Sequence, residues 1–151
     1  MPVASLEKMK TMVGRPIGTS PWIGISQKDI DIFAEVTGDH QFIHVDAEAA
    51  SRTPFGGTVA HGFLTLSLLS QMASHVMLVP DTLKMAVNYG FERVRFIAPV
   101  RSGKRVRGHF TLSALEEKRP GQWQMTHEVT IEIEGEDKPA LQAAWIGLIF
   151  T

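Results

Sequence analysis

The 151 residues of the chain, 44% hydrophobic and 21% charged, predict one soluble globular domain over residues 1–151. A formal net charge of −1 gives no electrostatic reason to expect nucleic acid or an anionic membrane as a partner. The absence of cysteine excludes disulfides, thiolate nucleophiles and cysteine-ligated metals.

The N-terminal part of the chain predicts short elements. Residues 1–10, MPVASLEKMK, lack the apolar core and cleavage site of a secretory signal, so we expect a cytoplasmic protein. Residues 5–12 predict a short helix that Ser5 caps. The residues GRPIGTSP then break this helix, and residues 22–26 alternate in polarity like a short strand.

A second, amphipathic helix is expected next. Ser26 and Asp29 have the spacing of a capping box, and the apolar residues after them recur on one helical face until Gly38 ends the helix. A loop follows, and a further short helix is expected over about residues 47–52, running into the glycine-containing loop 53–58.

The segment GFLTLSLLSQMASHVMLVP, residues 62–80, is apolar and nearly long enough to span a bilayer. Several polar residues interrupt it, and no further span accompanies it. We therefore expect no membrane span but a long helix that begins near Ala60 or His61 and is buried by protein on almost all sides.

The second half of the chain changes to the period of β-strands. Apolar residues alternate after Arg105 and again after a Pro-Gly turn, and residues 140–150 are apolar in both phases, which indicates a central strand. Residues 85–100 alternate too, but their phase changes near Glu92–Arg93, which predicts a β-bulge or a sharp bend. The expected fold class is therefore α+β, with a long central helix wrapped by a curved antiparallel sheet.

The stretch TGDHQFIHVD, residues 37–46, concentrates acid and imidazole. Asp39 and His44 are five residues apart in an expected loop, so both side chains can reach one water molecule. An imidazole titrates near neutral pH, and a carboxylate can orient it or share the water. Alternatively, Asp39 caps a turn and His44 packs at the base of the loop.

The pair His61–Gly62 opens the long helix. Backbone N–H groups in a first turn carry partial positive charge that suits an oxyanion, and Gly62 would let a substrate carbonyl approach closely. Alternatively, Gly62 is small because a strand crosses there. Ser67, Ser70 and Ser74 form one stripe of this helix, where serines usually bond to the preceding turn.

Two further groups of polar residues are open to more than one interpretation. A metal could bind near His40 and His44, but Gly38 places both in a loop rather than on one helical face, so we expect no metal. A basic run in the strand region is typical of a solvated face but could also hold a phosphorylated carrier; it consists of Arg93, Arg95, Arg101, Lys104, Arg105 and Arg107.

The segment TGDHQFIHVDAEAASRTPFGGTVAHGFLTLSLLS resembles the hydratase motif of the MaoC-like (R)-specific enoyl-CoA hydratases, in which Asp-x-Asn-Pro-x-His precedes a glycine-containing loop and Ala-His-Gly. VRFIAPVRSG is similar to the strand signature of this family. The resemblance extends from about residue 25 to 105. It implies a hot-dog fold, a homodimer, an acyl-CoA or acyl carrier protein thioester as substrate, and no cofactor.

The resemblance also implies a reaction. Asp39 and His44 match the catalytic dyad of the family, which implies that they activate one water molecule for reversible addition to a trans-2-enoyl thioester. The product implied is the (R)-3-hydroxyacyl thioester.

Further residues match substrate-binding positions of the family. Gly62 matches the residue whose N–H polarises the thioester carbonyl, and Ser70 matches the serine that supports the dyad. Gln41 and Phe42 replace the family's Asn-Pro, so Gln41 is expected to take over the orienting role of the asparagine. The oxyanion and substrate-binding residues expected are Gly62, Ser70, Gln41 and His61.

Two rival functions differ from a hydratase in what they require. Hot-dog thioesterases and hydroxyacyl-carrier dehydratases that use a carboxylate on the central helix are disfavoured, because residues 62–79 contain neither Asp nor Glu. A non-catalytic subunit that binds acyl chains or stabilises a partner would be expected to lack Asp39 and His44.

Overall fold

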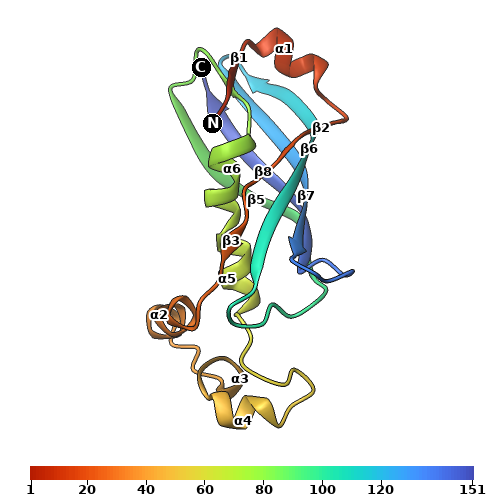
Figure 1. The fold of residues 1–151 in the computed structure, drawn as a ribbon. Coiled ribbons are helices and arrows are strands. Elements are labelled where there is room, and N and C mark those ends of the chain that lie inside the picture. Colours follow the sequence, from red (N-terminus) through yellow and green to blue (C-terminus); the bar gives the residue numbers. More distant parts are fainter.

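The computed structural model describes all residues 1–151 and has the expected α+β architecture, a curved antiparallel sheet against which a helix lies (Figure 1). The helices are α1 (Leu6–Thr11), α2 (Gln27–Thr37), α3 (Phe42–Val45), α4 (Ala47–Ser51), α5 (Gly62–Ser67) and α6 (Leu69–Val76). The strands are β1 (Val3–Ala4), β2 (Arg15–Thr19), β3 (Ile23–Gly24), β4 (Val79–Pro80), β5 (Met85–Phe96), β6 (Arg105–Arg119), β7 (Gln122–Ile133) and β8 (Leu141–Phe150).

The main sheet has the strand order β2-β6-β7-β8-β5, with β3 also pairing with β6. Side chains of β6 and β7 alternate between buried and partly exposed over most of their length, as their polarity alternates in the sequence. Strand β8 pairs with β7 on one side and β5 on the other, so the prediction of a central strand at this position is confirmed. Strand β5 is left at an edge of the sheet.

Strand β5 contains the predicted irregularity. Its pairing with β8 shifts register between Phe91 and Arg93, which confirms the bulge expected near Glu92–Arg93. A second shift lies between Asn88 and Gly90 and was not expected. Each shift inserts an extra residue opposite β8, which increases the local twist and bends the strand.

The long helix is divided into α5 and α6 at Leu68, where one continuous helix was expected. Just before the division, the Ser67 hydroxyl donates a hydrogen bond of 2.7 Å to the Phe63 carbonyl, an arrangement that often bends helices. One stripe of the helix is exposed, so burial on almost all sides is not observed; this stripe includes Phe63, Ser67, Ser70, Gln71 and Ser74. None of the helices has the length and hydropathy needed to cross a membrane.

The N-terminal half follows its capping signals. In α2, the Ser26 hydroxyl accepts from the Asp29 N–H and the Asp29 carboxylate accepts from the Ser26 N–H, so the predicted capping box is present. Gly38 ends α2 in the left-handed conformation with φ 74°. Helices α2, α3 and α4 lie together beyond the N-terminal end of α5, and we call them the α2–α4 lobe (Figure 1).

Strand β2 lies where the sequence predicted only a break between elements. It pairs with the outer side of β6, and an edge strand tolerates Pro16 because no inner ladder needs its missing N–H. The core then forms where the inner faces of β6, β7 and β8 meet the buried face of α6; its fully buried members include Met72, Phe110, Leu112, Ile131 and Ile149.

Candidate active site

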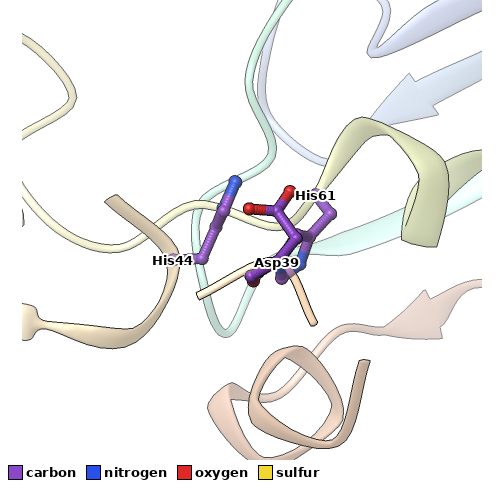
Figure 2. Close-up of side chains that lie close together, drawn as sticks. All are labelled: Asp39, His44 and His61. Carbon is purple, nitrogen blue, oxygen red and sulfur yellow. The ribbon is translucent and has the colours of Figure 1, made fainter. Parts of the chain in front are cut away.

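The candidate site lies where the α2–α4 lobe meets the start of α5. Gly38 turns the chain out of α2, and Asp39 follows in the loop, where its carboxylate accepts a hydrogen bond of 3.4 Å from the Gln41 N–H. His44 lies in α3, a single helical turn where the sequence predicted a loop. Figure 2 shows the side chains of Asp39, His44 and His61 converging from these segments.

The His44 ring is fixed by a main-chain carbonyl. Its Nδ1 lies 2.7 Å from the Val59 carbonyl oxygen, and the side chain is only 7% exposed. Because a carbonyl can only accept, Nδ1 must carry a proton, so Nε2 is the unprotonated nitrogen in the neutral form of the ring. The geometry therefore selects the tautomer in which Nε2 can receive a proton.

His61 holds the other two groups together. Its ring stacks on that of His44 with centroids 3.8 Å apart, and its Nε2 donates a hydrogen bond of 3.0 Å to the Asp39 carbonyl. The side chain is 3% exposed, and its Nδ1 is buried without a hydrogen-bond partner. His61 thus contacts both the ring of His44 and the backbone of Asp39.

The three side chains form one compact cluster. One ligand-type atom from each of Asp39, His44 and His61 lies within 4.8 Å of the others. Asp39 is exposed while both imidazoles are buried, so the cluster opens to solvent on its carboxylate side. The expectation of a metal-free site stays a prediction, because two imidazoles and a carboxylate are also ligands that Zn²⁺ accepts.

A cavity of about 220 Å³ adjoins the cluster and is lined mainly by apolar side chains. His44, Gly62 and Thr65 are among its lining residues, and the Gly62 N–H makes no hydrogen bond within the chain. A Cβ on Gly62 would lie 3.0 Å from ring atoms of Phe96, which belongs to β5. A side chain at this position would therefore crowd Phe96, and Gly62 combines a small residue with an unpaired N–H in the lining of the cavity.

Two expected site residues lie elsewhere. Ser70 is on the exposed stripe of α6 and lines separate cavities beside Asn88 and Trp145, not the cavity next to His44. The side chain of Gln41 makes no capping hydrogen bond, although its carbonyl accepts 2.9 Å from the His44 N–H. The roles expected for both residues stay predictions.

Phe42 occupies the first helical position of α3. This is a position where proline is favourable because its φ is already helical. Phe42 therefore replaces the family's proline without loss of the turn, and it leaves an aromatic side chain that is 47% exposed.

Gln27 supports the site and was not singled out in the sequence. Its amide nitrogen donates to the His44 carbonyl at 2.7 Å and to Asp31 at 2.8 Å, while its amide oxygen accepts from the Thr58 hydroxyl at 2.6 Å. Gln27 therefore ties α2 to α3 and to the residue that precedes Val59. Its place in the first turn of a capped helix was the sole sequence signal, and that signal indicates a helix start rather than a site.

Comparison with known proteins identifies relatives of the chain. Residues 8–135 match the family model described as "MaoC like domain". The chain is 52% identical over 145 residues to Nodulation protein N of Rhizobium meliloti, covering 95% of this chain and 90% of that protein. It is 45% identical over 139 residues to 3-hydroxyacyl-thioester dehydratase Z of Mycobacterium tuberculosis, covering 92% and 91%.

The fold also matches solved structures. The crystal structure of the MaoC-like dehydratase from Rhodospirillum rubrum superposes with a TM-score of 0.76 at 22% identity, covering 97% of each chain. This likeness confirms the predicted hot-dog fold.

Proposed function

Because the chain belongs to the family of MaoC-like dehydratase domains, we propose that it is a hydro-lyase that reversibly adds water to a trans-2-enoyl thioester, giving the (R)-3-hydroxyacyl thioester. One arrangement carries this proposal. A histidine whose tautomer leaves Nε2 unprotonated shares a cluster with a carboxylate, beside an apolar cavity.

Asp39 and His44 are proposed to hold one water molecule between them. As the water oxygen bonds to C3 of the substrate, His44 takes a proton through Nε2 and the electrons of the C2=C3 double bond move toward the thioester carbonyl. The proton delivered to C2 comes from the same pair of side chains, so both additions occur on one face of the double bond. A positioned general acid–base pair of this kind is worth about 10²–10⁴-fold in rate.

The developing oxyanion is proposed to be bound at the start of α5. The Gly62 N–H has no partner within the chain and its residue lines the cavity, so it is free to donate to the thioester oxygen. A donor that is fixed before the reaction stabilises this charge more than a mobile solvent molecule does.

The molecule is proposed to act as a homodimer. Strand β5 is an edge strand whose apolar side chains are exposed, with Tyr89 65% and Met85 50% accessible, and Phe63 of α5 is 66% accessible. An apolar sheet edge of this kind is usually covered by a partner. A second copy of the chain is the partner proposed, and light scattering of the purified protein measures it.

The experiment that tests the reaction follows the absorbance of the conjugated enoyl thioester. Crotonyl-CoA and a medium-chain trans-2-enoyl-CoA are offered separately, and products are checked for free thiol and for configuration at C3. Loss of absorbance with an (R)-3-hydroxy product and no thiol is expected. Release of thiol would instead identify a thioesterase, and no reaction with either CoA or carrier-protein thioesters would contradict the proposal.

A further inference from the structure

The basic run on the sheet divides into paired and unpaired side chains. Within the run, only Arg95 and Arg101 have no carboxylate within salt-bridge distance. The other four are neutralised, in the pairs Arg93–Glu128, Lys104–Glu136, Arg105–Glu134 and Arg107–Glu132. Hydrogen bonds from Arg107 and His109 keep the pKa of Glu132 low, so its carboxylate remains charged. Most of this surface is therefore electrically balanced.

Arg101 differs from Arg95 in where it lies. Residues 58–60 run beside residues 100–102, with Ala60 N–H bonded to the Val100 carbonyl at 2.8 Å and Val59 paired with Arg101 in an isolated bridge. Val59 is also the residue whose carbonyl fixes His44. The backbone of Arg101 is thus directly beside the segment that holds the candidate base.

The Arg101 side chain is directed over the loop 53–58. Its guanidinium covers Gly56, where an added Cβ would lie 3.2 Å from one terminal nitrogen and 3.8 Å from the central carbon. Gly56 has φ +68°, so a side chain at this position would be strained as well as crowded. The absence of a side chain at Gly56 lets the guanidinium lie against the loop.

Arg101 is one of the residues that line a cavity of about 520 Å³, most of whose other lining residues are polar or charged or are prolines. This cavity shares Ala98 and Pro99 with the cavity beside His44, so the two adjoin. The other charged side chains in its lining are Lys138, Asp137 and Glu136. Glu136 is paired with Lys104 at 3.2 Å, which leaves Arg101 and Lys138 as unpaired cations and Asp137 as an unpaired anion.

We propose that Arg101, assisted by Lys138, binds the phosphate at the far end of the substrate's pantetheine arm. This inference rests on the proposed thioester chemistry, because the arm must leave the catalytic cavity through an adjoining space. A guanidinium suits the role because its planar fork can donate two parallel hydrogen bonds to phosphate oxygens. Both CoA and the prosthetic group of acyl carrier protein place a phosphate at this point of the arm.

The test compares thioesters that differ only in the carrier. Crotonyl-CoA, crotonyl-acyl carrier protein and crotonyl-pantetheine present the same acyl group, but the last has no phosphate. Arg101→Gln is expected to raise KM about tenfold for the first two at unchanged kcat, as removal of a charge-assisted hydrogen bond does. The variant and the unmodified protein should have the same KM for crotonyl-pantetheine.

For a second variant we expect KM to change in the opposite direction. Asp137→Asn removes the anion that repels phosphate in the same cavity, so it should lower KM for crotonyl-CoA and leave crotonyl-pantetheine unaffected. Arg119→Gln is the matched control, because it removes the same charge at the β6–β7 turn, at the far end of the sheet, and should change no KM.

The outcomes separate the two proposals. A KM increase confined to the phosphate-bearing thioesters supports the site, and an effect on CoA alone identifies CoA rather than the carrier protein as its ligand. Equal KM values for Arg101→Gln and the unmodified protein, or an equal loss with crotonyl-pantetheine, would overturn it while leaving the hydratase intact. If the unmodified protein converts none of the three, the proposed function fails, and direct titration with CoA against pantetheine then decides whether Arg101 contributes to phosphate binding.

Discussion

Two buried regions of the molecule contain histidine, and they differ in the hydrogen bonds and surroundings that they give the imidazole. At the base of the α2–α4 lobe, His44 donates a hydrogen bond from Nδ1 to the Val59 carbonyl and has a cavity beside it. In the middle of β7, His127 is paired between Leu112 and Trp145, is 1% exposed, and has an Nδ1 with no hydrogen-bond partner. Burial alone lowers the pKa of His127 to about 4.

The comparison shows that burial is not what makes an imidazole useful. His127 is neutral and isolated, so it can neither receive a proton readily nor pass one on. His44 is buried almost as deeply, but the Val59 carbonyl selects its tautomer and the Asp39 carboxylate lies in the same cluster. Substitutions in each of the two regions test this contrast.

The largest effect is expected from the catalytic side. Asp39→Asn and His44→Ala should each lower the hydration rate by a factor on the order of a hundred or more, because each removes a group that is proposed to transfer a proton. Both variants should retain the fold, measured by circular dichroism, because Asp39 is exposed and His44 lies outside the main hydrophobic core. Near-full activity in either variant would contradict the assignment of the dyad.

In the second region, we expect His127 to make the folded protein less stable in acid. Its folded-state pKa of about 4 lies below the unfolded value of 6.5, so the unfolded chain binds the proton more readily. The free energy of unfolding should be greatest above pH 6.5 and should fall between pH 6.5 and 4, by about 3 kcal/mol in total from this group.

Two substitutions of His127 separate charge from polarity. His127→Leu should remove this acid-dependent loss and raise stability at neutral pH, because it also removes a buried unpaired polar atom. His127→Gln should remove the acid dependence without the gain at neutral pH. Urea unfolding across the pH range measures both effects. If both variants still lose the same stability in acid, another group is responsible for that loss.

A smaller effect is expected for His61, which contacts both members of the proposed dyad. His61→Phe keeps an aromatic ring against His44 but cannot donate to the Asp39 carbonyl, so kcat should fall roughly tenfold with little change in KM. His61→Gln offers a donor without the ring and tests the two contacts separately. A proportional rise in KM in both variants would indicate that His61 binds substrate directly instead.

The smallest effect is expected for Gln27, which supports the site from behind. Gln27→Leu removes its hydrogen bonds to the His44 carbonyl and the Thr58 hydroxyl and should lower the free energy of unfolding by about 1 kcal/mol. Lys28→Gln is the control, since Lys28 is an exposed neighbour with no hydrogen bond from its side chain. Equal stabilities in the two variants would contradict this role of Gln27.

The elements that the sequence predicted well are those whose burial follows a period or whose ends carry a cap. Strands β6 and β7 and the capping box of α2 belong to this group, and β8 was recognised instead from a run that is apolar in both phases. Strand β2 was missed because Pro16 and Gly18 are turn residues locally, and only pairing with the distant β6 makes the segment extended. The break at Leu68 was missed because the sequence does not show where Ser67 will bond.

The sequence also predicted part of the candidate site. Asp39, His44, His61 and Gly62 were all named from the sequence, and the structure places them around one cluster and cavity. The Val59 carbonyl was not named from the sequence. Every residue has a carbonyl, and only the fold decides which one contacts an imidazole.

The short segment Thr58–Ala60 has a consequence for motion. It belongs to no helix and forms only one isolated bridge, yet Val59 N–H is bonded to the Ile43 carbonyl at 3.0 Å and Ala60 N–H to Val100 at 2.8 Å. These two amides should therefore exchange with deuterium as slowly as those of a core strand rather than at the rate of a surface loop. The orientation of His44 then persists for as long as the surrounding fold does.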